Sequence, residues 1–308
     1  DTPELGIDPH QTLAIDTDYY FWFEVGSKRA QGAIDRGQTS VDTAGMAEGM
    51  RLHVVLFSFE NELGLAQKGD IGVFETHGPA DAAGQRAVRV AEAVSKPAGL
   101  PPGLSERRLF FPVHTPATPG VYRLRCNIYF KQVLLQSRLV SIKVSALPAR
   151  NERPVLDTVL DYTISDSLRA ELVTAVPEHR LSLMLNDNGN GTHGFRLYGS
   201  DGAVAFKNDA TITEAEIGAK ISHARERLRE VAWGTTKEWT DKDRYRYEGA
   251  RSLADFRTDL IRLARAGFRI HDHVAARLAK QTGKLDGDAR DDLAELMRRP
   301  GRVQIAAK

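Results

Sequence analysis

The chain has 308 residues, of which 42% are hydrophobic and 27% are charged, a balance typical of folded proteins and not of disordered chains. Its 42 Lys and Arg side chains almost cancel its 41 Asp and Glu side chains, so no overall basic charge favours nucleic acid as a partner. The sequence contains no apolar run of about 18 residues, which excludes a membrane-spanning helix. A chain of this length is expected to form two domains.

The single cysteine and the first residue bear on the cellular compartment. Cys126 cannot form an internal disulfide, which favours a reducing cytoplasm. The chain begins at Asp1 without a methionine or a signal segment, which predicts a processed or trimmed product. We therefore expect a cytoplasmic protein.

The first half of the chain has the pattern of β-strands. Apolar residues recur there with period two, between breaks rich in Gly, Pro and Asp. The pattern predicts a β-sandwich over residues 1–148, with an Ala-rich insertion that forms a short helix or a long loop. The clearest strands are DYYFWFEVG, MRLHVVLFSFE, GDIGVFETHG, RRLFFPVH and GVYRLRCNIYFKQVLLQSRLVSIKVSA.

The last of these runs predicts a long β-hairpin with a turn near Lys131 and Gln132. Within it Cys126 shares an inward apolar face with its alternate neighbours, while Arg123 and Arg125 lie on the opposite face. This alternation predicts a half-buried strand. Its start, TPGVYRLRC, resembles the entry to the sixth strand of immunoglobulin-like domains, where a Gly and a Tyr form a corner.

The second half of the chain, residues 149–308, predicts a mixed region that follows a Pro-containing connection. Three or four antiparallel strands come first, and a helix then begins at a capping box formed by Thr211 and Glu214 or by Thr213 and Glu216.

A further helix follows in this second half, with Ser252 as its cap. Gly267 inside that helix indicates a break or a close helix crossing. The final RVQIAAK predicts a strand whose partner sheet is missing from this sequence.

The stretch LMLNDNGNGTHGF could be a metal loop, a catalytic loop or a turn. Asn186, Asn188 and Asn190, followed by Gly191, imitate the opening of a calcium loop. Counted from Asn186, the twelfth position holds Leu197 where such a loop needs a bidentate Glu, and neutral amides replace carboxylates. We interpret the stretch as a turn, with Asn and Gly chosen for positive backbone angles.

A catalytic reading of the chain would combine His193 with Cys126 and Asp187. No nucleophile stands beside His193 in the sequence, and Cys126 points to an apolar face, where a thiolate is disfavoured. The sequence therefore predicts no catalytic residues in this chain.

The remaining candidates for metal ligands have ordinary structural explanations. His271 and His273 are two residues apart on a predicted helix, so their side chains point to different faces. A last short helix is predicted at ARDDLAELMRR, and the acidic cluster near its start is explained by the favourable placement of carboxylates near a helix N-terminus. This cluster consists of Asp286, Asp288, Asp291 and Asp292. We therefore predict no metal and no cofactor.

Taken in order, these segments resemble the non-catalytic N-terminal region of bacterial CHAT-domain proteins, which are caspase-like peptidases. The resemblance implies an α+β chain in which an immunoglobulin-like β-sandwich precedes a mixed β-hairpin and helical region that introduces a caspase-like α/β domain. The segments that carry it are GVYRLRCNIYFKQVLLQSRLVSIKV, LSLMLNDNGNGTHGFRLYG, ARERLREVAWG, LARAGFRIHDHVAARLA and RRPGRVQIAA.

In that family a His activates a Cys thiolate at positions that would lie beyond Lys308, so neither catalytic residue can be carried over to this chain. The resemblance implies a regulatory half that binds a partner or a signal, in a cysteine peptidase of a bacterial defence or self-killing system. The expected partner is a protein, such as the catalytic portion itself, and not a membrane. The alternative is a stand-alone β-sandwich binding protein with no peptidase.

Overall fold

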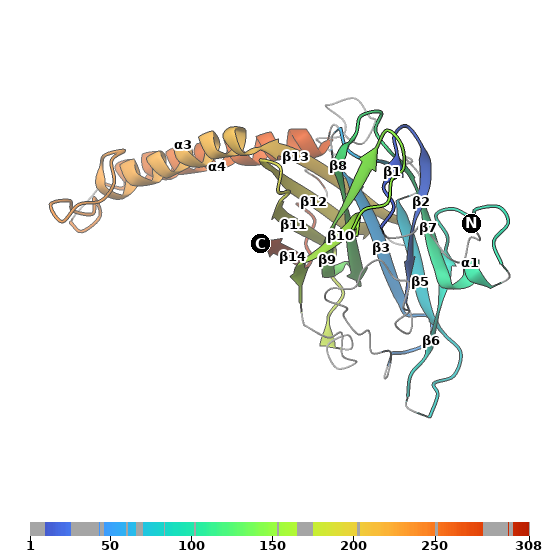
Figure 1. The fold of residues 1–308 in the computed structure, drawn as a ribbon. Helices are drawn as coiled ribbons and strands as arrows, with labels where there is room; N and C mark the ends of the chain where they lie inside the picture. The colour runs from blue at the N-terminus through green and yellow to red at the C-terminus, as the bar shows by residue number, and fades with distance from the viewer. Residues whose placement is uncertain are drawn as a thin grey trace. The chain divides into compact units, whose positions relative to one another are not determined.

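A computed structural model describes residues 10–25, 43, 46–59, 61–65, 70–82, 84–101, 103–152, 154–164, 175–201, 204–249, 252–279, 295 and 298–307. These residues form mostly β-sheet with few helices, so the predicted α+β class is confirmed. Figure 1 shows the helices and strands that these residues form. By their contacts they divide into two compact units. The first contains residues 1–182, 199–205 and 302–308, and the second contains residues 183–198 and 206–301.

Among the described residues of the first unit, two sheets surround one hydrophobic core. A short helix, α1 (Leu104–Arg107), precedes β7. The larger sheet has the strand order β1 (Leu13–Ala14), β9 (Val133–Ser145), β8 (Gly120–Phe130), β3 (Arg51–Ser58), β5 (Ile71–His77) and β6 (Ala87–Glu92), and β10 (Leu156–Thr163) also pairs with β9. The smaller sheet has the order β2 (Asp18–Glu24), β7 (Arg108–His114) and β4 (Gly64–Leu65).

The predicted hairpin is confirmed as β8 and β9, which are antiparallel over their whole length. Lys131 and Gln132 connect them with positive φ angles of 48° and 59°, the conformation that a two-residue hairpin turn requires. Both sheets contribute side chains to the same hydrophobic core. These include Leu124 of β8, Phe111 of β7 and Phe21 of β2.

The prediction that β8 is half-buried was wrong. Arg125, Asn127 and Tyr129, on the face opposite Cys126, are each 0% exposed. Arg125 Nη1 donates to Asp161 Oδ2 of β10 at 2.5 Å and to Ser137 Oγ of β9 at 2.8 Å. These partners replace the water lost at Nη1 and supply a counter-charge, whereas Nε and Nη2 have no acceptor among the described residues.

The Ala-rich stretch is a loop in part, as one of the two alternatives predicted, but it also contains a strand that was not predicted. Residues Ala87–Glu92 form β6, antiparallel to β5, and Val88 and Val90 pack against the core. Alternating Val residues, which favour strands, outweigh the helix propensity of the alanines.

Tyr122 near the start of β8 closes a corner of the first unit. Its hydroxyl donates to the backbone carbonyl of Thr118, four residues upstream, at 2.7 Å. A Cβ added at Gly120 would lie 3.2 Å from the Tyr122 ring, so a glycine there gives the ring room.

The predicted linker around residue 150 is followed by β10, which is antiparallel to β9 over Leu156–Thr163. Strand β10 therefore extends the larger sheet of the first unit. The division into domains 1–148 and 149–308 remains a prediction. The two compact units are defined by their contacts, whereas a domain is defined by its ability to fold independently.

A third sheet has the strand order β13-β12-β11-β14. The sequence prediction that the final strand has no partner sheet in this chain was wrong, because β14 pairs with β11. A strand pattern shows alternation but not the identity of the neighbouring strand. The bounds are β11 (Leu181–Asp187), β12 (Thr192–Asp201), β13 (Val204–Thr213) and β14 (Val303–Ala307).

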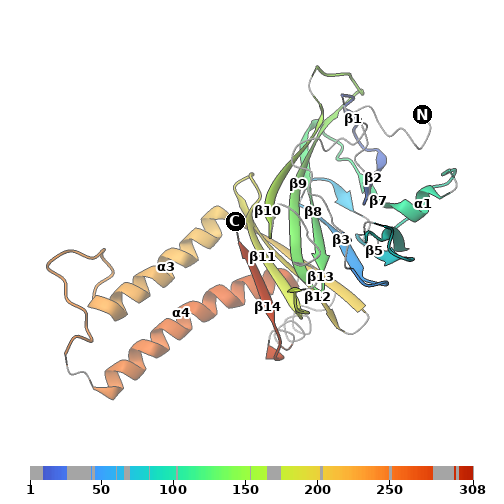
Figure 2. The same cartoon turned by 90° about the horizontal axis from the view of Figure 1, so that it is seen from below.

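The second unit contains two long helices that lie side by side, α3 (Glu214–Trp233) and α4 (Leu253–Ala279) (Figure 2). Of the two predicted capping boxes, the structure forms the one between Thr213 and Glu216. Gly234 ends α3 with φ 83°, a left-handed conformation that glycine adopts without a steric penalty. None of the helices in the described ranges is both long enough and apolar enough to cross a membrane.

Helix α4 begins where the sequence predicts, since Ser252 Oγ accepts a hydrogen bond from Asp255 N at 3.1 Å. The expected break or close crossing at Gly267 was wrong. The helix continues through this residue, and a Cβ added there would meet no atom within 4 Å. A glycine inside a helix lowers its stability, but α4 is 27 residues long and forms many other helical hydrogen bonds on both sides of Gly267.

Candidate functional site

The Asn- and Gly-rich stretch is the turn between β11 and β12, as predicted. Gly189 and Gly191 have φ angles of 71° and 76°, and Asp187 Oδ1 accepts a hydrogen bond from Gly189 N at 2.7 Å. The asparagines do not share the positive angles, so that part of the interpretation was wrong. Their side chains have another role.

Asn186 and Asn188 hold the guanidinium of Arg196, which is fully buried. Asn186 Oδ1 accepts from Arg196 Nη1, and Asn188 Oδ1 accepts from Arg196 Nη2 at 3.2 Å. Gly194 is required beside them, because a Cβ there would overlap the guanidinium. The amide oxygens that a calcium loop would direct at a cation therefore face a cationic side chain of the same hairpin. Sequence reasoning missed Arg196, although its position two residues after Gly194 on the same strand face was a usable signal.

Cys126 lies in the core of the first unit and is 3% exposed. Burial raises the pKa of its thiol to about 12, and the charge of Arg138 only partly opposes this effect. A thiol of this kind is not ionised near neutral pH and is a poor nucleophile. The catalytic reading with Asp187 and His193 thus lacks a nucleophile, and His193 lies in β12 of the second unit.

His271 and His273 have different surroundings on α4, as their spacing predicts. Burial and the nearby charges of Lys220 and Arg277 lower the pKa of His273. The ring of His271 lies 6.3 Å from that of Phe268 instead. The acidic cluster before the last predicted helix (Asp286, Asp288, Asp291 and Asp292) lies outside the described residues.

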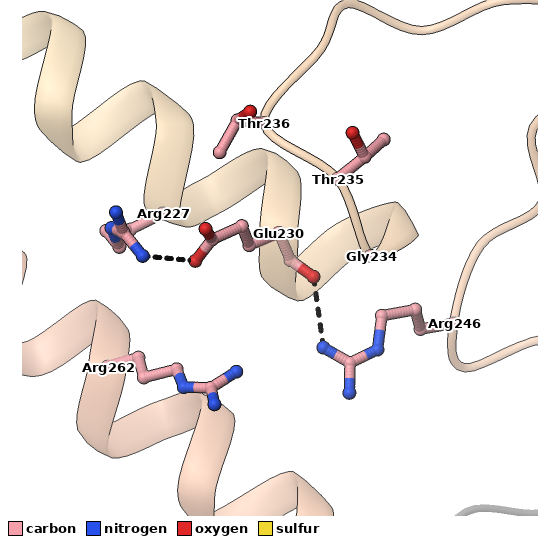
Figure 3. A pocket seen from close by; sticks show the side chains of 7 residues that line it. All are labelled: Arg227, Glu230, Gly234, Thr235, Thr236, Arg246 and Arg262. Atoms are coloured by element: carbon pink, nitrogen blue, oxygen red, sulfur yellow. Dashed lines mark hydrogen bonds and ion pairs between the residues drawn. The ribbon is translucent and has the colours of Figure 1, made fainter.

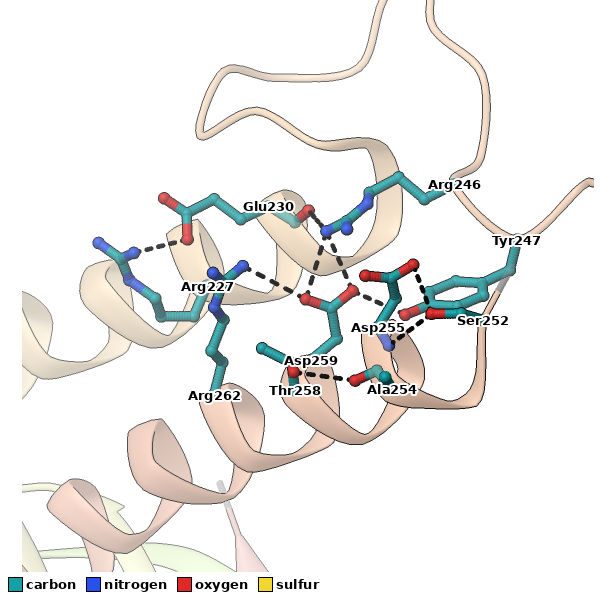
Figure 4. A network of polar contacts seen from close by, with 10 residues as sticks. All are labelled: Arg227, Glu230, Arg246, Tyr247, Ser252, Ala254, Asp255, Thr258, Asp259 and Arg262. Carbon is teal, nitrogen blue, oxygen red and sulfur yellow. Dashed lines mark hydrogen bonds and ion pairs between the residues drawn. The ribbon is translucent and has the colours of Figure 1, made fainter. Parts of the chain in front are cut away.

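A network of polar contacts in the second unit surrounds Asp259 on α4 (Figure 4). This carboxylate is 2% exposed and accepts hydrogen bonds from the Tyr247 hydroxyl at 2.6 Å and from Arg246 Nη1. Arg262, one turn further along α4, approaches it to 3.3 Å. The network fixes the end of the segment between the two helices onto α4. A sequence signal existed, since Asp259 stands four residues before Leu263 and seven before Ala266 and thus on the buried helical face.

A cavity of about 660 Å³ opens beside this network (Figure 3). Arg227 of α3, Arg262 of α4 and Arg246 of the connecting segment supply three guanidinium groups to its wall. Glu230 pairs with Arg227, and Gly234, Thr235 and Thr236 complete the lining. The sequence analysis did not predict this site, because its three arginines are 19 and 16 positions apart in sequence and meet only when α3 and α4 pack together.

Aromatic side chains gather at the same end of the helix pair. The rings of Trp239 and Tyr245 stack with centroids 4.6 Å apart, and Trp233 meets Trp239 edge-on at 5.6 Å. Trp239 and Tyr245 are nevertheless 41% and 53% exposed. Exposed Trp and Tyr side chains of this kind are enriched in protein interfaces.

Strand β14 ends the third sheet and carries apolar side chains to the surface. Val303 and Ile305 are 50% and 68% exposed. The Gln304 side chain between them accepts from Leu134 N of β9 at 2.6 Å and donates to Leu134 O at 3.1 Å, and it also accepts from Ser182 Oγ at 2.7 Å. One face of β14 thus contacts β9 and β11 through Gln304, while the other exposes an apolar pair.

Comparisons with known proteins add one relative. A curated protein of Vitiosangium sp. (strain GDMCC 1.1324) is 36% identical over 314 aligned residues, and its name is "Probable protease". The alignment covers 99% of this chain but only 38% of that protein. No protein-family model matches the chain, and no solved structure is similar to it. The chain therefore corresponds to somewhat over a third of a protein that carries a protease name.

Proposed function

We propose that this chain is the regulatory, partner- or signal-binding N-terminal part of a bacterial caspase-like cysteine peptidase that acts in a defence or self-killing system. The observation that carries the proposal is the relative named as a probable protease, which matches this chain along 99% of its length and is much longer. The catalytic His and Cys are then supplied outside residues 1–308. Cys126, buried and with a raised pKa, does not take their place.

The immunoglobulin-like assignment of the first unit is part of this proposal. It is supported by two sheets around one core and by the Tyr122 hydroxyl that donates to Thr118 O. A tyrosine near the start of a strand that bonds to backbone a few residues upstream is a recurrent corner in such sandwiches. By analogy with cell-surface domains that share this architecture, we assign partner or signal binding to this unit.

The second part of the proposal places the peptidase contact on β14. This strand is the last in its sheet, and edge strands accept further strands through their free backbone groups. Val303 and Ile305 add an apolar pair that a caspase-like α/β domain would cover.

The test is binding of this chain to the remainder of the full-length protein, produced separately and measured by titration calorimetry. We expect Ile305→Asp to weaken the interaction at least about tenfold, because a carboxylate would be buried without a partner. Val121→Asp, at a position of β8 that is 55% exposed in the same unit, serves as the matched control and should bind like the wild type. Equal binding by both variants would remove β14 from the interface.

The alternative, a stand-alone β-sandwich binding protein without a peptidase, is favoured by one observation. Strand β14 already has a partner in β11, so the chain does not need an external sheet to hold it. Under this alternative, Val303 and Ile305 would have no peptidase to contact, and no separately produced remainder of the protein would bind.

A further inference from the structure

We propose that the three-arginine cavity between α3 and α4 binds the phosphoryl group of a small phosphate-bearing molecule. The cavity lies wholly within the second unit and does not depend on the peptidase proposal. Its wall combines the guanidinium groups of Arg227, Arg246 and Arg262 with the hydroxyl-bearing residues Thr235 and Thr236 (Figure 3).

The cavity has more guanidinium groups than carboxylates around it. Two carboxylates, Glu230 and Asp259, face the three guanidinium groups. Glu230 pairs with Arg227, whereas Asp259 is shared between Arg246 and Arg262. Three guanidinium groups therefore gather beside two carboxylates at an open site, which favours an anion from solution.

The arginines also have donors left for a ligand. Arg227 uses Nη1 for Glu230, and its side chain is 34% exposed, so part of its guanidinium group remains accessible to a ligand. The side chain of Arg262 is 50% exposed and approaches Asp259 through Nη1, so the rest of its donor fork is open to a ligand.

Arg246 has a positioning role in this site. Its Nη1 donates to Glu230 O at 3.0 Å, in the last turn of α3, and pairs with Asp259 of α4. It thereby ties the two walls of the cavity together and neutralises the partial negative charge of the helix C-terminus, which would otherwise repel an anion.

The donor set fits a phosphoryl group better than a carboxylate. Guanidinium forks that approach from two helices offer several donors, and the three oxygens of a phosphoryl group can accept more of them than the two oxygens of a carboxylate. A volume of about 660 Å³ also admits a molecule larger than a single side-chain carboxylate.

Titration of the chain with inorganic pyrophosphate, at constant ionic strength, tests the proposal. We expect a dissociation constant of about 1 mM or tighter, and a loss of at least about tenfold in Arg262→Gln and in Arg227→Gln. Arg257→Gln changes an exposed arginine of α4 outside the cavity and should bind like the wild type. Circular dichroism at 222 nm would check that each variant keeps its helices.

Three results would overturn the proposal. These are the absence of pyrophosphate binding up to about 10 mM, unchanged binding in both cavity variants, or equal weakening in the Arg257→Gln control, which would indicate non-specific attraction to positive charge. A parallel titration with acetate and succinate separates the ligand classes. Binding of these carboxylates as tight as that of pyrophosphate would assign the cavity to acidic groups, such as those of a protein partner, and not to phosphate.

Discussion

Arg125 of β8 and Asp161 of β10 form an ion pair of 2.5 Å whose side chains are 0% and 3% exposed. The pair lies on the face of the larger sheet that sequence analysis had assigned to solvent. It joins a strand of the predicted sandwich to a strand that follows the predicted linker. Breaking the pair would leave a buried guanidinium without its counter-charge.

We therefore predict that Asp161→Asn lowers the free energy of unfolding of the first unit by roughly 3–5 kcal/mol. Asp157→Asn, on the same strand but exposed, should change it by less than about 0.5 kcal/mol. Urea denaturation followed by tryptophan fluorescence measures both, since Trp22 lies in β2 of this unit. Equal stabilities of the two variants would show that the pair contributes nothing.

Cys126 should be inert in the folded protein. Because burial raises the pKa of its thiol to about 12, almost no thiolate exists at pH 8. We expect no reaction with an aromatic disulfide reagent over an hour at pH 8, and complete reaction within minutes in a denaturant. A fast native reaction would reopen the reading of Cys126 as a nucleophile.

Alanine substitutions at two glycines, one in α4 and one at the end of α3, should change stability in opposite directions. Gly267→Ala should stabilise α4 by about 1 kcal/mol, because the added Cβ meets open space and alanine favours the helix. Gly234→Ala should destabilise α3 by about 1–2 kcal/mol, because φ is 83° there. Thermal unfolding followed at 222 nm measures both. A stabilising Gly234→Ala would contradict the left-handed end of α3.

His53 on β3 should make stability depend on pH. Burial, with a smaller effect of the Arg51 charge, lowers its pKa from 6.5 to about 4, although Glu92 acts in the opposite direction. Between these values the unfolded chain binds a proton that the folded chain does not, so stability falls as the pH drops from about 6.5 to about 4. The contribution is fully present above pH 6.5.

The matched variants are His53→Gln, which should flatten this part of the stability curve, and His77→Gln at the exposed end of β5, which should not. Urea denaturation at several pH values between 4 and 7 measures the slope. A slope unchanged in His53→Gln would mean that other groups cause the pH dependence.

The sequence predicted those features of the fold that depend on neighbours in the chain. Period-two patterns located β2, β3, β5, β7, β8 and β9, and local capping chemistry located the starts of α3 and α4. The turn at Lys131 and Gln132 followed from the two strands that flank it.

Features that depend on distant residues could not be predicted. The buried state of Arg125 rests on Asp161, 36 residues later, and the pairing of β14 rests on β11, more than a hundred residues earlier. The arginine cavity requires the antiparallel packing of α3 and α4, and the role of Asn186 becomes visible only when Arg196 lies against it. In each case the partner is fixed by tertiary packing, which no local pattern encodes.

The central claim is that this chain serves as the regulatory part of a larger cysteine peptidase. Sequencing the parent gene on both sides of the codons for residues 1–308 tests it most directly. The account predicts one continuous reading frame that also encodes a His and a Cys, each following a predicted strand of a caspase-like sheet. A frame that encodes only this chain, with no peptidase frame beside it, would contradict the claim and leave a stand-alone binding protein.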